Sequence, residues 1–355
     1  MRKTLLTLGF MLLFWSIPAA LMVVDPCLRY CRTDYGKYLW IGRELAQSPK
    51  EYAYVFVGSS HMLHAIDAAT VGTDLAGSPD AAINAATSWL GRDTSCLVAR
   101  DFVKHHRVRN LVVECTLQEY AGSHQFFSFL CLPEDVIRHA YARKLFRAEA
   151  WIGNGDYREA TRFILTNLAS VGLRGYLRLR CRRDCCEGAR TESEYSQHRG
   201  FVPFDGEKDQ VSAWRARQAS YDSPPIRHDW DPETVPEGKR TTIWHNELTR
   251  LAAEARKQDT RLILLCVPER LNLLSSEGYL RYLSRLGQVM PFPREILADP
   301  NLWRDEAHLN VEGARRFTDY FVASELCRIK SSEGCALGLR SRGKINPATT
   351  MLREP

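Results

Sequence analysis

Apolar residues in this chain gather in short runs, separated by longer segments with helical spacing. Four of these runs are rich in β-branched and aromatic residues and lack polar alternation, which predicts strands buried on both faces. They span residues 52–58, 81–86, 110–115 and 261–268. Helical spacing predicts helices over 88–106, around 244–255, and after Asn310, a residue type typical of an N-cap. The alternation predicts an α/β fold, a three-layer αβα sandwich with a mostly parallel sheet.

The N-terminus carries a different pattern. Arg2 and Lys3 precede an uncharged stretch from Thr4 to Val24, long enough to cross about 30 Å of hydrocarbon as a helix. The stretch is longer than a typical signal-peptide core and has no clean small-residue cleavage site. We therefore favour a retained single-pass transmembrane anchor over residues 1–25, rather than a cleaved signal peptide.

The rest of the chain divides by pattern into three parts. Residues 45–330 contain the predicted strands and helices and form one α/β domain. Within it, residues 120–239 are an insertion, helical in its first half and rich in Pro, Asp and Gly in its second; such insertions commonly build a wall above a sheet edge. Residues 331–355 have little apolar periodicity and predict a flexible basic tail.

The amino-acid composition excludes few classes of function. The chain is 45% hydrophobic and 25% charged, which is ordinary for a globular protein, and its formal net charge is +6. No zinc finger, RNA-binding motif or aromatic-interleaved basic stripe occurs, so we expect no nucleic-acid partner. Eleven cysteines, an odd number, do not settle the redox compartment.

The first strand ends abruptly in Gly58-Ser59-Ser60. Ligands of open parallel sheets bind outside the carboxyl ends of the strands, where these residues are expected. One interpretation is a simple turn with two cap-like serines. The other is a turn that presents a nucleophile.

A second motif favours the nucleophile. Asp305 precedes His308 by three residues, just ahead of the last predicted helix. A serine needs a base to react near neutral pH, and a carboxylate can orient an imidazole for that role. A metal site at His61, His64 and Asp67 is the alternative, but no third-ligand motif accompanies it; we expect neither a metal nor an organic cofactor.

Together, these blocks resemble the SGNH (GDSL-type) hydrolase superfamily, in which a Gly-x-Ser turn follows the first strand and a D-x-x-H pair precedes the last helix. Ser60 matches the nucleophile position, Asp305 and His308 match the pair, and Leu309-Asn310-x-x-Gly313 is also typical. The anchor and insertion look like the membrane-anchored branches, such as DltD-like and alginate-acetylation proteins. The resemblance implies Ser60, His308 and Asp305 as a catalytic triad, with His61 lining the pocket.

The oxyanion hole departs from the family pattern. That pattern uses a glycine after the second strand and an asparagine after the third. Here Ala86 or Ser88 stands near the glycine position, and no asparagine follows the third strand. We expect the backbone N–H of Ser60 to act with donors around Asn84, Ala86 and Thr87. Thr116 or Gln118, after the third strand, is the alternative donor.

The resemblance implies a serine esterase or O-acyltransferase acting on an acylated small molecule or an envelope polysaccharide. It also implies a place in the cytoplasmic membrane, with the catalytic domain on the extracytoplasmic side and a multi-pass acyltransferase as a partner. The alternative is a catalytically degenerate SGNH-like binding or scaffold protein in an envelope polysaccharide assembly.

Overall fold

The computed structural model describes residues 36–87, 92–115, 195–204, 243–267, 277–305 and 308–338. The predicted anchor and most of the predicted insertion lie outside these residues. No helix in the described ranges is both long enough and apolar enough to span a membrane.

Five parallel strands form one sheet in the order β2-β1-β3-β4-β5. The chain first adds β2 on one side of β1 and then builds β3, β4 and β5 on the other, so its winding reverses between β1 and β3. Ligand sites of such sheets form at this switch point, outside the carboxyl ends of the strands. The strands are β1 (Glu51–Val57), β2 (Ala82–Asn84), β3 (Arg107–Cys115), β4 (Arg261–Cys266) and β5 (Gln288–Met290).

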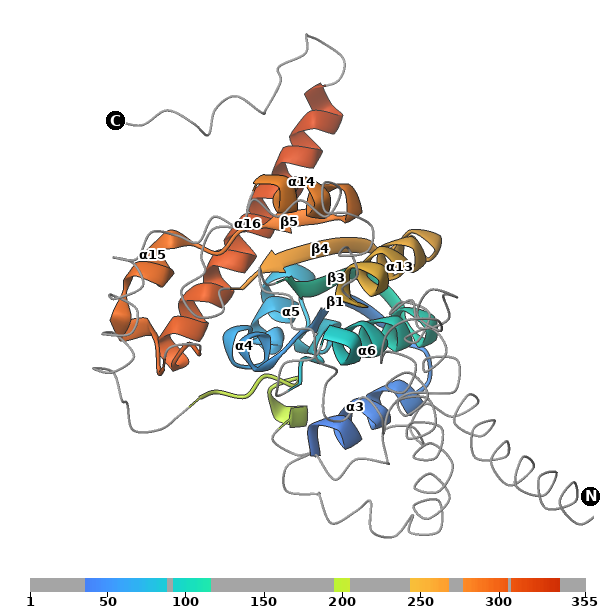
Figure 1. The fold of residues 1–355 in the computed structure, drawn as a ribbon, viewed down its shortest axis with the longest axis horizontal. Coiled ribbons are helices and arrows are strands. Elements are labelled where there is room, and N and C mark those ends of the chain that lie inside the picture. Colours follow the sequence, from blue (N-terminus) through green and yellow to red (C-terminus); the bar gives the residue numbers. More distant parts are fainter. Residues whose placement is uncertain are drawn as a thin grey trace, which may run out of the picture.

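Helices cover both faces of this sheet (Figure 1). On one face lie α3 (Gly36–Ala46), α6 (Arg92–His105), α13 (Ile243–Lys257) and α14 (Glu277–Leu286). On the other lie α4 (Ser60–Ala65), α5 (Ala68–Ala76), α15 (Arg294–Ala298) and α16 (Val311–Gly338). Two short 3-10 turns, η1 (Pro79–Ala81) and η3 (Pro300–Leu302), are also present.

Side chains of β1 alternate between the two cores, as the period of two in a strand requires. Val55 and Val57 join the core beneath α3 and α6, whereas Tyr54 and Phe56 join the core beneath α16. All four are almost fully buried. Burial on both faces explains why the sequence of this strand is an unbroken apolar run.

Helix α16 closes the second face and links the two ends of the described domain. Its Phe321 packs edge-on against Tyr54 and Phe56 of β1, with ring centres 5.8 and 5.2 Å apart. The hydroxyl of Thr318 also accepts the backbone N–H of Asp67, ahead of α5, at 3.1 Å. These contacts hold the start of α16 against the segment that follows β1.

The α/β class and the parallel sheet are as predicted, and the four predicted strands correspond to β1 to β4. Patterning missed α3, α5, α14, α15 and the three-residue β5. Helix α16 continues through Gly338, so the first residues of the predicted tail are helical. A helix that is already formed adds one hydrogen bond for each further residue, so it can continue without an apolar face.

Candidate active site

The turn after β1 is shaped by a close approach of backbone and side chains. A Cβ on Gly58 would overlap the Glu114 carboxylate and Met62 Cβ, so only glycine fits there. Ser59 then caps α4, because its Oγ accepts the His61 backbone N–H at 3.3 Å. Ser60 is therefore the first residue of α4, at the carboxyl edge of the sheet.

A tight loop between η3 and α16 brings in the second part of the site. Trp303 and Leu309 form an isolated antiparallel bridge, and the backbone N–H of Arg304 donates to the His308 carbonyl at 2.9 Å. A Cβ on Gly313 would overlap the Leu302 carbonyl, so glycine permits α16 to start directly beneath this loop.

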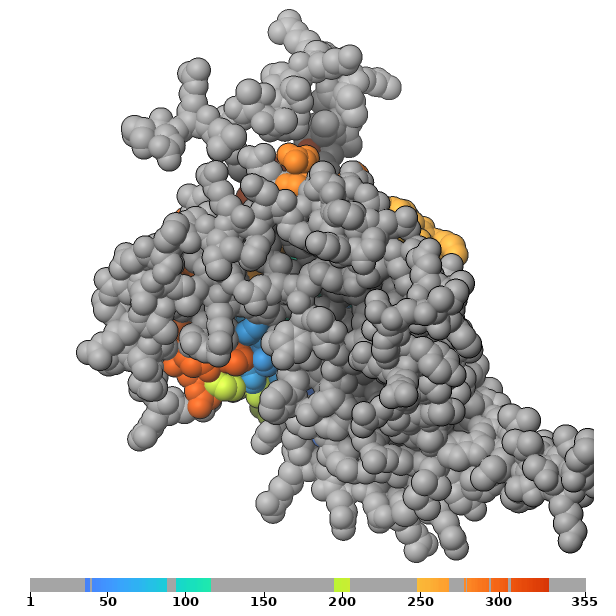
Figure 2. All heavy atoms as spheres, viewed as in Figure 1, coloured from blue at the N-terminus to red at the C-terminus, as the bar shows by residue number. Residues whose placement is uncertain are grey.

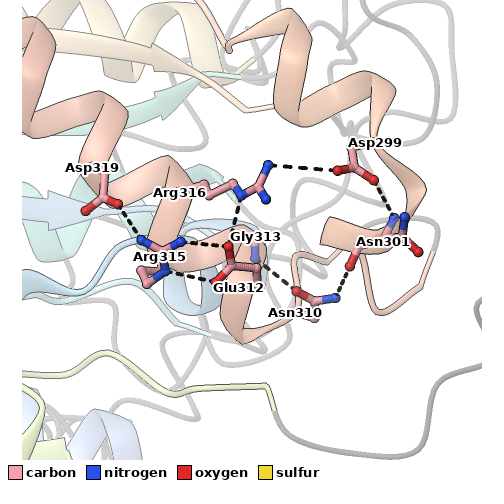
Figure 3. A network of polar contacts seen from close by, with 8 residues as sticks. All are labelled: Asp299, Asn301, Asn310, Glu312, Gly313, Arg315, Arg316 and Asp319. Atoms are coloured by element: carbon pink, nitrogen blue, oxygen red, sulfur yellow. Dashed lines mark hydrogen bonds and ion pairs between the residues drawn. The ribbon is translucent and has the colours of Figure 1, made fainter.

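Polar contacts fix the loop to α16 (Figure 3). Asn310 caps the helix by accepting the Gly313 N–H at 2.9 Å, and its amide donates to the Asn301 carbonyl at 2.6 Å. Arg316 reaches from α16 to Asp299 at 3.9 Å. The predicted N-cap role of Asn310 is confirmed.

Ser60 and His308, 248 residues apart in the sequence, meet at the sheet edge. His308 Nε2 lies 2.9 Å from Ser60 Oγ, and His308 Nδ1 lies 2.9 Å from Asp305 Oδ2. The carboxylate can only accept, so Nδ1 carries the hydrogen and Nε2 is left to accept the serine O–H. This is the tautomer that a general base needs.

The side chains of Asp305 and His308 differ in exposure. The side chain of Asp305 is 43% exposed and that of His308 20% exposed. Asp305 Oδ1 also accepts the backbone N–H of His308 at 2.8 Å, which fixes the carboxylate beside the ring. The pair is thus accessible from outside. Figure 2 shows blue atoms, yellow-green atoms of segment 195–204 and orange-red atoms next to one another on one face of the molecule.

A buried carboxylate lies beneath the turn. Glu114, at the end of β3, has no exposed surface. It accepts the Ser59 backbone N–H at 2.6 Å and the Ser59 hydroxyl at 2.8 Å. His61 Nδ1 approaches Ser59 Oγ at 3.2 Å and Glu114 Oε1 at 3.4 Å. His61 therefore lies beside the triad, its ring centre 5.2 Å from that of His308, and supports the turn.

Segment 195–204 supplies the wall on the other side of His308. Val202 donates its N–H to the Leu63 carbonyl at 3.3 Å and accepts Nδ1–H of His64 at 2.8 Å. Phe204 stacks on the His308 ring, with centres 5.2 Å apart and planes 25° apart. The segment thus forms a rigid aromatic face next to the imidazole.

Lys37 of α3 anchors this wall from below. The side chain is fully buried, and its Nζ donates to the carbonyls of Asn84 at 2.5 Å and Gly200 at 2.6 Å. It also lies over the rings of Trp40 and Tyr195, 4.5 and 5.0 Å from their centres. Burial lowers the pKa of the amine well below its ordinary value. The carbonyls and rings offset the cost of desolvating the cation.

The expected oxyanion donors have other partners. The amide nitrogen of Asn84 donates to the carbonyls of Met62 and Ile66, at 3.0 and 2.9 Å. The backbone N–H of Ala86 donates to Asn84 Oδ1 at 3.1 Å, and that of Thr87 to the Gly58 carbonyl at 3.1 Å.

These groups therefore tie the end of β2 to α4 and to the nucleophile turn, rather than pointing donors outward. The reason is local: a buried strand end must satisfy its own polar groups. The backbone N–H of Ser60, in the first turn of α4, remains the expected oxyanion donor, because the first N–H groups of a helix have no intrahelical partner.

The metal alternative gains no support among the described residues, which contain no group of three His, Cys, Asp or Glu side chains placed to hold an ion. His64 packs between Phe204 and His308, with ring centres 4.3 and 5.6 Å away. Asp67 caps α5 through the N–H groups of Ala69 and Thr70. Both side chains therefore have structural roles.

His64 gives a testable pH dependence. Burial lowers its pKa to about 4, although its bond to the Val202 carbonyl acts in the opposite direction. The neutral ring is favoured in the fold, so its contribution to stability is present above the unfolded pKa of about 6.5 and is lost as the pH falls towards 4. The loss over this interval is on the order of 3 kcal/mol. At neutral pH an uncharged His64 also spares a nearby His308 imidazolium from repulsion.

We expect the free energy of unfolding, measured by urea titration, to fall more steeply between pH 6.5 and 4 in the wild type than in His64→Gln. Glutamine can still donate to the Val202 carbonyl but does not titrate. If the free energy of unfolding falls equally with pH in the two proteins, His64 is not the group that causes the loss of stability.

Sequence reasoning missed Glu114, Lys37, Phe204 and Arg304 as residues that shape the site. Glu114 carried a signal, since it is the single charge in the apolar run Asn110 to Cys115. The other three carried none, because Phe204 and Arg304 lie a hundred residues apart and the two carbonyls bound by Lys37 are 47 and 163 residues away from it. Comparison with models of known protein families and with curated proteins finds no match to this chain.

Proposed function

We propose that this protein is a serine-dependent esterase or O-acyltransferase with Ser60 as its nucleophile. The observation that supports the proposal best is the continuous chain of hydrogen bonds from Ser60 Oγ through His308 to Asp305, with 2.9 Å at each step. Together with the α/β sheet order and the two sequence blocks, this geometry favours the SGNH-type interpretation over a simple strand-ending turn.

In the proposed reaction, Ser60 Oγ attacks an acyl carbonyl while His308 Nε2 takes the serine proton. The tetrahedral intermediate collapses, and Nε2 returns that proton to the departing alcohol oxygen. An acyl-serine remains. Water or an acceptor hydroxyl then attacks it, passing a proton to Nε2, which finally protonates Ser60 Oγ. Asp305 holds Nδ1–H throughout and stabilises the imidazolium.

The balance between hydrolysis and transfer depends on what reaches the acyl-serine. Water gives an esterase, and a sugar hydroxyl gives an O-acyltransferase. We retain transfer to or from an envelope polysaccharide as the favoured physiological reaction, on the strength of the resemblance and of the predicted N-terminal anchor.

One observation favours the degenerate alternative. The donors at Asn84, Ala86 and Thr87 are occupied, and loss of one oxyanion donor typically lowers the rate by about 10²- to 10³-fold. A protein with an intact triad and a weak oxyanion hole would form an acyl-serine slowly and could serve chiefly as a binding module.

The test is turnover of 4-nitrophenyl acetate by the full-length chain. We expect Ser60→Ala to lower kcat/KM by at least about 10³-fold, because it removes the hydroxyl that would form the acyl-enzyme. The matched control is Ser59→Ala, one residue away, which removes the cap and the Glu114 contact but not the nucleophile. Equal activity in the wild type and Ser60→Ala, or no activity in either, would favour the scaffold function.

A further inference from the structure

Arg304 occupies an unusual position beside the proposed nucleophile. Its guanidinium carbon lies 3.7 Å above the centre of the Phe204 ring, and that ring is the one stacked on His308. Separations of 3.7 Å and 5.2 Å from the same ring place the guanidinium within about 9 Å of the imidazole centre. A positive, planar group is thus held on the aromatic wall next to the proposed base.

The guanidinium has no partner of its own within the described residues. Its five N–H donors form no hydrogen bond or ion pair there, and the side chain is only half-buried. The exposed arginines of α16 differ, because Arg315 and Arg316 both pair with Glu312. Stacking on a ring fixes the plane of a guanidinium and leaves its edge directed outward, which suits two-point recognition of a carboxylate or phosphate.

The side of the substrate that Arg304 faces follows from the proposed chemistry. His308 Nε2 must protonate the departing oxygen, so the alcohol part of the ester lies on the His308 side of the carbonyl. Phe204 covers that side. The alcohol part, and equally an acceptor that later takes its place, would therefore lie along Phe204 towards Arg304.

We propose that Arg304, presented on Phe204, binds an anionic group, carboxylate or phosphate, carried by the alcohol part of the substrate. This inference rests on the proposed function, since it uses Ser60 and His308 to set the orientation. The preferred ester or acceptor would then be acidic, with its negative charge several bonds away from the reacting oxygen.

Three aryl acetates test the inference, all presenting the same acetyl group to Ser60: 4-acetoxybenzoate, 4-acetoxyphenyl phosphate and the neutral methyl 4-acetoxybenzoate. At constant ionic strength we expect the wild type to prefer the anionic esters, measured as kcat/KM. Arg304→Met, which retains an apolar contact with Phe204, should reduce this preference by about 10- to 100-fold, the range for a charge-assisted contact. The rate on the neutral ester, measured in each variant, is the reference against which this preference is calculated.

Two further variants sharpen the result. Arg304→Lys keeps the charge without the planar fork and should retain part of the preference. Arg107→Met removes one exposed positive charge at the start of β3, at the opposite edge of the sheet, and should retain all of it. The ratio between the two anionic esters distinguishes a phosphate-bearing from a carboxylate-bearing substrate.

The same anionic-to-neutral ratio in wild type and Arg304→Met would overturn this inference and leave the proposed function standing, because Ser60 would still be acetylated. Turnover of none of the three esters would overturn both.

Discussion

His308→Ala is expected to lower kcat/KM for ester turnover by about 10⁴-fold or more, with little change in stability. The serine hydroxyl would lose the acceptor 2.9 Å away, which is the base placed to take its proton. The imidazole is partly exposed, and within the described residues its ring nitrogens bond only to Ser60 and Asp305, so we expect the core to tolerate its loss. Steady-state kinetics with 4-nitrophenyl acetate measure the loss.

Asp305→Asn is the matched variant for His308→Ala. An asparagine can still accept the His308 backbone N–H, but its amide would face Nδ1 and favour the wrong ring tautomer. Because the Asp305 side chain is 43% exposed, water can partly replace it, and we expect a smaller loss of about 10²- to 10³-fold. Activity within tenfold of wild type in both variants would contradict a triad mechanism.

Glu114→Ala is expected to have the largest effect on stability, lowering the free energy of unfolding by about 3 kcal/mol. The change would remove the acceptor of two buried Ser59 donors and leave a cavity under Gly58. Buried donors left without an acceptor cost about 1–3 kcal/mol each, and hydrogen bonds to a charged group are stronger than neutral ones.

Glu114→Gln separates shape from charge at the same position. Its carbonyl oxygen can still accept the Ser59 N–H, while its amide can donate to the Ser59 hydroxyl oxygen. We expect it to recover at least half of the stability lost in Glu114→Ala, as measured by urea denaturation with tryptophan fluorescence. A Glu114→Ala protein as stable as the wild type would show that the carboxylate does not support the turn.

The strands show which part of the fold can be predicted from the sequence. β1, β3 and β4 are buried on both faces, so they appear as apolar runs that need no tertiary information. β5 has only three residues, one of which is buried, and thus leaves almost no pattern. Helix α3 was missed, and its buried Lys37 contradicts the usual rule for charged residues.

Some residues of the candidate site could likewise be predicted from the sequence, and others could not. Gly58, Ser60, Asp305 and His308 could be singled out because their spacing and chain order form recognisable blocks. The partners of Asn84 could not be foreseen, since its amide is taken by the carbonyls of Met62 and Ile66 through packing of α4 on β2. Phe204 and Arg304, likewise, meet across a hundred residues of sequence.

The central claim is that Ser60 is an activated nucleophile, and the location of a covalent adduct tests it most directly. The full-length chain would be treated with a fluorophosphonate, digested and mapped by mass spectrometry. We predict one phosphonyl group per chain, carried by Ser60 and absent from both Ser60→Ala and His308→Ala. An unmodified Ser60 in the wild type, or an adduct confined to Ser59 or another residue, would contradict the proposed mechanism.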